Sequence, residues 1–281
     1  MATPVITGTN LGDVTDDQLE ALRRDGITAQ KAAFTREWTQ RMGEDIDAAF
    51  TEARGREGGA VGRGPNRYYV EIHPEQLRGF VDLVTHPWVT SVCEAVLGSD
   101  YEFVEVGFDI PFAGAVNQPW HRDFPAPPET LQEGRYTSLA FNLTAVDTEA
   151  DMGPFEIALG TQFDAPDERW EYGMFPPRES YGRYAERAVR KYPMMGDVSV
   201  RSALTIHRGT ANRSEKSRPV LVLGAEAPGS ERVVEHAPTV TERYWRGLPG
   251  RVRAHLRCPV VDQLTPIVQK HQIEGLVMGD A

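Results

Sequence analysis

Alternating apolar and polar residues in the middle of the chain constrain its fold more than any other feature. Residues 104–110 (VEVGFDI) place apolar side chains at every second position, and residues 136–146 (YTSLAFNLTAV) do the same. Because successive side chains of a strand point to opposite faces, this pattern predicts strands buried on one side. Turn-rich segments separate these strands without helical crossovers, which favours an antiparallel sandwich or barrel. Three further segments predict strands: 155–159, 197–207 and 219–226.

The part of the chain before these strands predicts helices. Thr15 begins a sequence with the spacing of a capping box, and Gly26 lies where a short helix would end. An apolar stripe over residues 38–50 predicts an amphipathic helix of about 18 residues. Further apolar stripes predict a helix that starts at Pro74 and another that ends at Gly98.

Two connecting segments stand out by their composition. Residues 54–67 (RGREGGAVGRGPNR) lack the spacing of a phosphate-binding loop and predict a flexible connector. Residues 164–193 form a long insertion between two strands, which indicates either a lid or a poorly ordered excursion. The six aromatic residues of this insertion argue against plain disorder.

Composition limits the partners and the compartment. The formal net charge of −11 disfavours nucleic acid or an anionic membrane and would favour a cationic substrate, although excess acid also serves solubility. We find neither a signal peptide at the N-terminus nor an apolar run of the ~20 residues that span a bilayer. Cys93, which lies in an apolar stripe, and Cys258 do not suggest a disulfide framework, so we expect a cytoplasmic protein.

A histidine and an aspartate two positions apart, His121 and Asp123, are either two solvated polar residues or two ligands of a metal site. Residues i and i+2 of a strand share a face, so both side chains can reach one ion. His207, at the end of the predicted strand 197–207, is the third candidate ligand. Two histidines and one carboxylate form the ligand set of non-haem Fe(II) oxygenases, although zinc binds the same residue types.

Arg218 follows His207 by 11 residues and begins the next apolar strand. A planar guanidinium is suited to a bidentate grip on a carboxylate, as an anionic chelating acid at the metal would require. The alternative is a surface charge at a strand edge. Arg213 is a second cation that could hold the acid.

Three motifs together resemble the phytanoyl-CoA dioxygenase family of Fe(II)/2-oxoglutarate oxygenases. They are WHRD (120–123), MGPFEIALGTQF (152–163) and GDVSVRSALTIHRGTANRSEKSRP (196–219), and the match runs from about 70 to 226. The resemblance implies a mainly β fold, a double-stranded β-helix or distorted jelly roll, buttressed by N-terminal helices. We expect one domain over residues 1–281, made of a helical part (about 11–98), a jelly-roll core (about 101–226) with the insertion, and a C-terminal tail (227–281).

The resemblance also assigns roles. His121, Asp123 and His207 match the iron ligands, and Arg218 matches the arginine that binds the distal carboxylate of 2-oxoglutarate. Asn142 sits where relatives often place a residue near the cosubstrate. The cofactors implied are Fe(II), 2-oxoglutarate and O2. Independently of the resemblance, we expect the loop around Arg67, Tyr68 and Tyr69 and the insertion at 164–193 to contact the substrate. Trp120 and Arg122, which are next to the candidate ligands, are further candidate substrate contacts.

The sequence departs from the family pattern at two places. Leu159 and Gln162 replace the usual Pro and His of a turn. Gly209 occupies a position where relatives can carry a serine that assists the cosubstrate carboxylate, and the neighbouring Thr210 could substitute for it. Asp123 is present where related halogenases have a small residue, so oxidation is expected and halogenation is not.

The predicted activity is oxidation of a C–H bond of a small metabolite, by hydroxylation, desaturation or ring closure, in a biosynthetic pathway. A non-catalytic metal-binding sensor or storage protein is the alternative. A zinc hydrolase would need a general base, for which Glu156 is the nearby candidate, although we expect Glu156 to be solvated. The basic residues 243–259 predict a solvated C-terminal helix more than a nucleic-acid site. The oligomeric state is not defined by the sequence.

Overall fold

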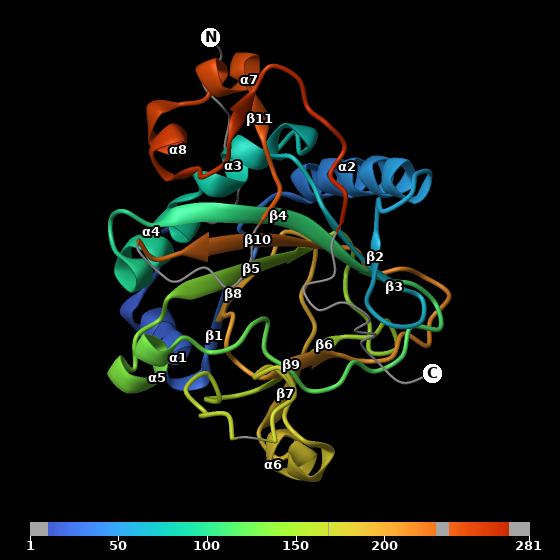
Figure 1. Cartoon of the computed structure of the whole chain (residues 1–281), viewed down its shortest axis with the longest axis vertical. Helices are drawn as coiled ribbons and strands as arrows, with labels where there is room; N and C mark the ends of the chain where they lie inside the picture. Colours follow the sequence, from blue (N-terminus) through green and yellow to red (C-terminus); the bar gives the residue numbers. More distant parts are fainter. Residues whose placement is uncertain (1–10, 168, 229–235, 270–281) are drawn as a thin grey trace.

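A seven-stranded antiparallel sheet runs through the centre of the molecule (Figure 1), within residues 11–167, 169–228 and 236–269, which the computed structural model describes. Every neighbouring pair of strands in it is antiparallel, as the sequence predicts. In spatial order the strands are β1 (Ile27–Gln30), β8 (Val198–Ser202), β5 (Ser138–Thr144), β10 (Val220–Glu226), β4 (Glu102–Pro111), β3 (Arg67–Glu71) and β2 (Val61–Gly62).

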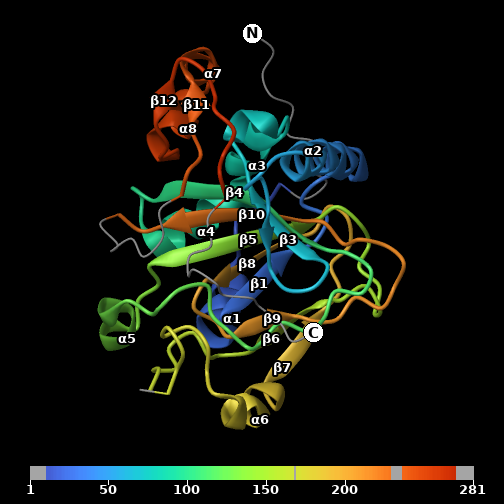
Figure 2. The ribbon, with the colours of Figure 1, turned by 45° about the vertical axis from the view of Figure 1, so that its right-hand side comes forward.

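A smaller antiparallel sheet lies opposite the larger one in both views of the ribbon (Figures 1 and 2). In the described part of the chain it contains β7 (Ala188–Lys191), β6 (Phe155–Ala158) and β9 (His207–Gly209), with β6 in the centre. Two facing antiparallel sheets with flanking helices form a double-stranded β-helix, so the predicted fold class is confirmed.

Helices cover the outer face of the larger sheet (Figure 2). α2 (Arg36–Arg54), α3 (Phe80–Val84) and α4 (Pro87–Leu97) share one buried apolar cluster with outward-facing strand residues such as Phe108 and Phe141. Each large apolar side chain buried there contributes roughly 1.5–3 kcal/mol, so this cluster gives the sheet a rigid support. Among the described residues, no helix has the length and apolar character needed to cross a bilayer.

The first helix, α1 (Asp16–Asp25), begins and ends where the sequence predicts. The Gln18 amide N–H donates to the Thr15 hydroxyl at 3.3 Å, and the Thr15 amide N–H donates to the Gln18 side chain at 3.0 Å. Gly26 ends the helix with φ of 77°, and a Cβ there would lie 2.4 Å from Thr205 Oγ1. Glycine is therefore required at this position both by the backbone and by the close approach of the turn before β9.

The helix predicted from Pro74 is divided. A 3-10 turn, η1 (Pro74–Gln76), comes first, and α3 starts only after Gly79. A Cβ at Gly79 would lie 2.6 Å from the Trp38 indole ring, so the chain turns where α2 packs most closely. The apolar spacing indicated the buried face correctly but could not show this break.

The strand predicted over 197–207 is also divided. β8 ends at Ser202, a turn follows in which the Thr205 amide N–H donates to the Ser202 carbonyl at 3.1 Å, and β9 starts at His207. β8 belongs to the larger sheet and β9 to the smaller one. The apolar residues of the turn are buried at the corner between the sheets, so the hydrophobic pattern continues through it.

Part of the insertion at 164–193 is a regular element of the fold, and its role as a lid stays a prediction. Its last residues form β7, which pairs with β6. Trp170 and Tyr184, which precede β7, are buried against Trp120, so these aromatic residues form a small second core. The remaining elements of the insertion are η2 (Arg178–Ser180) and α6 (Tyr181–Ala185).

The C-terminal part forms two short helices instead of the one predicted over 243–259. Leu248 and Val252 are buried in the main apolar cluster, so this part is packed and not merely solvated. Residues 229–235 and 270–281 of the predicted tail lie outside the described residues. The elements are β11 (Val240–Thr241), α7 (Glu242–Gly247), α8 (Gly250–His255) and β12 (Val260–Val261).

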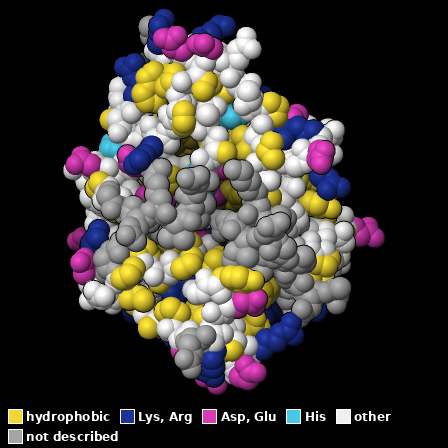
Figure 3. Space-filling view, viewed as in Figure 1, with side chains coloured by type: hydrophobic (Ala, Val, Ile, Leu, Met, Phe, Trp, Pro, Cys, Tyr) yellow, Lys and Arg dark blue, Asp and Glu magenta, His cyan; other side chains and the backbone are white. Residues whose placement is uncertain are grey.

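The surface view shows acidic and basic side chains interspersed over the described part of one face (Figure 3). Charges of opposite sign also form ion pairs along the chain, as Arg246 and Glu242 do on α7. The expectations that the protein binds neither nucleic acid nor membranes stay predictions.

Candidate metal centre

The backbones of His121 and His207 hold the candidate metal centre together. The His121 amide N–H donates to the His207 carbonyl at 3.0 Å, and the His207 amide N–H donates to the His121 carbonyl at 2.8 Å. This is an isolated antiparallel bridge, so residues 121–123 do not form the regular strand that we predicted. Asp123 is held by its amide N–H, which donates to the Ala203 carbonyl at 3.0 Å.

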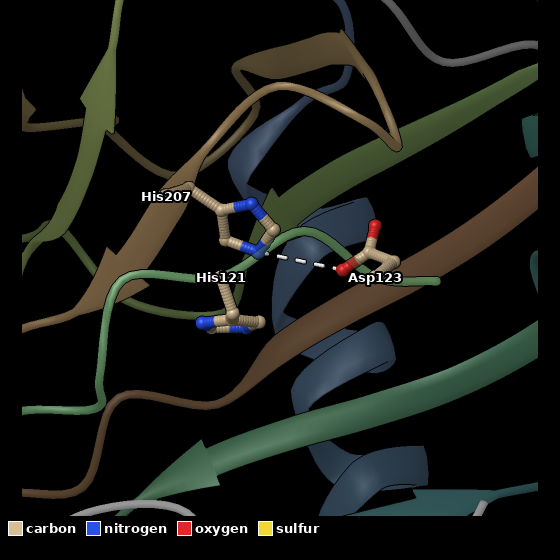
Figure 4. Close-up of side chains that lie close together, drawn as sticks. All are labelled: His121, Asp123 and His207. Carbon is tan, nitrogen blue, oxygen red and sulfur yellow. Dashed lines mark ion pairs between the residues drawn. The ribbon is translucent and has the colours of Figure 1, made fainter. Parts of the chain in front are cut away.

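The three side chains converge as the metal prediction requires (Figure 4). One ligand atom of each residue lies within 4.8 Å of the others, and His207 Nε2 is 3.4 Å from Asp123 Oδ1. Both histidines are buried, with 6% and 4% of His121 and His207 exposed. One ion can therefore reach all three residues.

The hydrogen bonds of the two imidazoles prepare them for metal binding. His121 Nδ1 lies 2.8 Å from the Pro119 carbonyl, and His207 Nδ1 lies 2.8 Å from the Thr205 carbonyl. Because a carbonyl only accepts, each Nδ1 carries the proton and each Nε2 keeps a free electron pair. Burial lowers the pKa of both histidines. The proximity of His207 lowers the pKa of His121 further, because two protonated imidazoles would repel each other, and the Arg201 cation lowers the pKa of His207 further. Both histidines are therefore neutral at pH 7.

The carboxyl group of Asp123 is held in its ionised form. Burial alone would raise its pKa, but Arg201 and His207 lower the pKa well below the usual range. Arg201 donates to both carboxylate oxygens, at 2.6 and 3.3 Å. Two neutral imidazoles and one carboxylate are a donor set that fits a divalent iron ion, and zinc would accept the same atoms.

A cavity of about 490 Å³ opens beside these ligands, between the two sheets. Its floor is the inner face of the larger sheet, to which β3, β4, β5, β8 and β10 each contribute side chains. Other walls come from the segment that holds His121 and from the smaller sheet. The lining side chains include Arg67, Tyr69, Glu71, Glu105, Asp109, Asn142, Phe155, Arg201, Arg218 and His236.

Arg218 lies in this cavity and is only 3% exposed, so the alternative of a surface charge at a strand edge is wrong. Its Nε donates to the Met152 carbonyl at 3.3 Å and to the Gly153 carbonyl at 3.1 Å, and its Nη2 donates to the Gly153 carbonyl at 2.8 Å. Burial and the nearby charge of Arg67 lower the pKa of Arg218 to about 10, which still leaves it a cation at neutral pH.

Two predicted cosubstrate contacts differ in their positions. Asn142 lines the cavity from β5, as an inward-facing residue of the predicted alternation should. Thr210 does not line it; its hydroxyl donates to the Pro154 carbonyl at 2.7 Å. The Thr210 hydroxyl is therefore bound to the backbone. Contrary to our prediction, it does not take the place of the serine that relatives can carry at the position of Gly209. Arg213 is exposed and also lies outside the cavity lining.

The predicted substrate contacts divide in the same way. Arg67 lines the cavity, but Tyr68 points to the other face of β3, where it packs against Phe50 and Phe112 with ring centroids 5.7 and 6.0 Å apart. Consecutive residues of a strand cannot both face the same cavity, so Tyr69 takes the inward position.

Trp120 and Arg122 do not line the cavity either, which corrects our prediction for both. Their side chains are 1% and 0% exposed and belong to the small core under the insertion. Arg122 lies over the Trp170 ring at 4.7 Å and donates to the Asp164 carbonyl at 2.7 Å. Alternation with the metal ligands places both residues behind the site.

Glu156 is buried rather than solvated. It forms ion pairs with Arg190 at 2.9 Å and Arg208 at 2.6 Å and does not line the cavity. The zinc hydrolase alternative therefore loses the general base that we considered for it.

Several cavity residues were not identified from the sequence. Arg201 lies inside the 196–219 motif, and its place among buried alternating residues was a usable signal. Glu105 and Asp109 form the polar side of 104–110, which the alternation also indicated. His236 reaches the cavity from the tail, and no local pattern marks it.

A double-stranded β-helix that presents two histidines and an aspartate to one cavity defines the class of non-haem iron oxygenases. The family model for phytanoyl-CoA dioxygenase (PhyH) matches residues 22–220, so the chain belongs to this family of Fe(II)/2-oxoglutarate-dependent dioxygenases. The match begins at α1, earlier than the motifs indicated, and thus includes the helices that support the larger sheet.

Two solved structures have the same fold. The non-heme alpha-ketoglutarate-dependent carbocyclase SnoK from nogalamycin biosynthesis is 16% identical with a TM-score of 0.61, and the match covers 80% of this chain and 91% of SnoK. AviO1 from Streptomyces viridochromogenes Tue57 is 17% identical with a TM-score of 0.60, and the match covers 80% of this chain and 99% of AviO1.

Proposed function

We propose that this enzyme couples the oxidative decarboxylation of 2-oxoglutarate to the oxidation of a C–H bond in a small metabolite, with release of succinate and CO2. One observation carries the proposal: the His121, Asp123 and His207 side chains and the buried Arg218 line the same cavity. A sensor or storage protein would need the three ligands but not a buried cation in the same cavity.

In this proposal His121, Asp123 and His207 hold Fe(II), and Arg201 keeps Asp123 ionised. Iron bound with 2-oxoglutarate supplies the O2-dependent oxidation that amino-acid side chains cannot perform. The protein contributes the positions: Nε2 of each histidine is free, and the Asp123 carboxylate is oriented by its two bonds from Arg201.

Arg218 binds the distal carboxylate of 2-oxoglutarate. Three of its donor contacts fix the guanidinium to backbone carbonyls, so the side chain is preorganised and loses little freedom on binding. Asn142, on the inward face of β5, is placed to contact the cosubstrate or the substrate next to it.

The substrate occupies the other end of the cavity and is a free small molecule, because about 490 Å³ accommodates a ligand of drug-like size. SnoK is a carbocyclase from nogalamycin biosynthesis, which supports a biosynthetic role and keeps ring closure among the outcomes beside hydroxylation and desaturation. Asp123 occupies a coordination position, so halogenation is not expected.

A cationic group on the substrate is favoured by the carboxylates at that end. Glu105 accepts a hydrogen bond from the Tyr69 hydroxyl, and burial raises the pKa of Glu105. Gly107 and Gly224 leave room for this pair. A Cβ at Gly107 would lie 2.5 Å from Tyr69 Oη, and a Cβ at Gly224 would lie 2.9 Å from Glu105 Cβ. An ammonium group against Glu105 would offset the cost of burying its charge.

Succinate release tests the proposal. The protein is supplied with Fe(II), 2-oxoglutarate and O2 and is screened against a metabolite library rich in amines, with succinate measured for each compound. Turnover that depends on one class of compound is the expected result. Tight iron binding without succinate formation from any compound would support the sensor or storage alternative instead.

A further inference from the structure

Arg67 carries a buried hydrogen-bond donor that nothing in the described chain accepts. The residue is 2% exposed at the start of β3. Its Nε donates to the two Asp109 oxygens at 3.0 and 3.2 Å, and its Nη2 donates to one of them at 3.0 Å. Its Nη1 is buried and has no hydrogen-bond partner among the described residues. Such a donor on a charged group is costly, so a ligand that accepts from it is the natural explanation.

The position of the guanidinium is set by Gly209. A Cβ at Gly209 would lie 1.9 Å from Arg67 Nη1 and 2.0 Å from Nη2, so any other residue at 209 would displace the guanidinium. Gly209 does not have a positive φ, and glycine is therefore required there for space and not for backbone conformation. Because Gly209 follows His207 by two residues in β9, Arg67 reaches the immediate neighbourhood of the metal ligands.

The charges in this corner do not balance. Arg67 and Arg218 are two buried cations, and both interact with the single carboxylate of Asp109. Among the buried groups, two positive charges against one negative charge leave a net charge of about +1 at the cosubstrate end of the cavity, and the partly exposed Arg63 adds a weaker positive influence on Asp109. One further carboxylate would neutralise the corner and accept from the free donor.

We propose that Arg67 Nη1 is a second donor to the distal carboxylate of 2-oxoglutarate. The Arg67 guanidinium lies in the space that a side chain at position 209 would fill. This inference rests on the proposed function and reassigns Arg67 from the substrate to the cosubstrate. Arg67 and Arg218 then bind the distal carboxylate together, and Asp109 orients Arg67.

The test measures equilibrium binding by calorimetry to the Mn(II)-loaded full chain, which avoids turnover. The two probes are 2-oxoglutarate and 2-oxopentanoate, which share the 2-oxo acid group and differ in the distal carboxylate. Arg67→Met should raise the Kd of 2-oxoglutarate about 10- to 100-fold, as expected for the loss of a charged hydrogen bond, and leave that of 2-oxopentanoate unchanged. Arg213→Met, which removes an exposed arginine outside the cavity, is the matched control and should change neither.

Position 209 supplies a test that a merely structural role of Arg67 would not pass. Gly209→Ser in the wild-type chain should weaken 2-oxoglutarate binding, because the serine displaces the guanidinium. The same substitution combined with Arg67→Met should strengthen 2-oxoglutarate binding relative to Arg67→Met alone, because a hydroxyl then fills the vacated space. The double variant Arg67→Met/Asp109→Asn, which leaves no buried carboxylate unpaired, repeats the measurement if Arg67→Met alone is unstable.

The outcomes separate this inference from the proposed function. Unchanged 2-oxoglutarate affinity in Arg67→Met and in the double variant, or an equal loss for both probes, would overturn the inference while leaving the function in place. A wild-type chain that binds Mn(II) but not 2-oxoglutarate would overturn both.

Discussion

The two ends of the cavity floor are built from the same strands but carry opposite charge. On β3 the inward residues run from Arg67 to Glu71, and on β4 they run from Asp109, the partner of Arg67, to Glu105. Four residues of extended chain separate the ends by about 13 Å. Arg67 and Arg218 make one end cationic, whereas the other end presents carboxylates. A dianionic cosubstrate would therefore bind at the first end and a cationic substrate at the second, and neither would bind well at the end of the other.

Removing a metal ligand should have the largest effect, because both ends depend on the ion between them. His121→Ala and Asp123→Ala should each abolish succinate formation and weaken Fe(II) binding, while the circular dichroism spectrum stays that of the wild type. Trp120→Phe, next to His121 but outside the cavity, is the control for local damage. Unchanged turnover in either ligand variant would show that the metal site lies elsewhere.

Removing the cationic end should affect one ligand only. Arg218→Ala should raise the KM for 2-oxoglutarate between about 30- and 1,000-fold, for the ~2–4 kcal/mol of a charged hydrogen-bonded pair. The KM for the substrate should stay within a factor of about two. Initial rates over a range of both concentrations measure this, and Arg213→Ala is the matched control. A similar increase for both ligands would contradict a division of the cavity into two ends.

The converse change at the acidic end should be smaller, because Glu105 is only partly buried. Glu105→Gln keeps the shape and the Tyr69 contact but removes the charge, and it should raise the KM of an amine substrate about 10-fold with 2-oxoglutarate unaffected. The ratio of kcat/KM for the amine and for its uncharged analogue is the sharper measurement. A ratio equal to that of the wild type would remove the argument for a cationic substrate.

A last effect concerns the stability of the acidic end and not the binding of a ligand. Burial alone would lower the pKa of His236, but its hydrogen bond with Glu71 and the charges of Glu105 and Glu226 raise the pKa to about 9. Since this value lies above the 6.5 of an unfolded histidine, the stabilisation is complete below pH 6.5 and is lost as pH rises through about 9.

Chemical denaturation between pH 6 and 10 measures this contribution, which should be on the order of 2 kcal/mol. His236→Gln should flatten the pH dependence of the free energy of unfolding over that interval. A variant that loses stability with rising pH as the wild type does would show that another group titrates there.

The comparison of the two ends also explains what the sequence could predict. The three candidate metal ligands and Arg218 lie in short motifs that resemble those of the family, and Asn142 follows from alternation along β5. Tyr68, Trp120 and Arg122 are direct sequence neighbours of residues that line the cavity. A neighbour along an extended chain points the other way, which is why these three residues lie outside the cavity.

Features that arise from contacts between residues distant in sequence could not be predicted from local motifs or from alternation along a strand. The turn between β8 and β9 is apolar like the strands around it, because it is buried between the sheets. The pairing of His236 with Glu71 joins positions 165 apart, and no local pattern announces it. The requirement for glycine at 209 depends on Arg67, which comes from another strand of the larger sheet.

The reciprocal backbone bonds between His121 and His207 have a consequence for thermodynamic linkage. They join the loop that carries His121 to the edge of the smaller sheet, and Asp123 is joined in turn to the larger sheet through Arg201. An ion bound by these three residues is therefore also a cross-link between the two layers, and its binding free energy adds to the resistance of the whole molecule against unfolding. Chelators should accordingly lower the melting temperature as well as the activity.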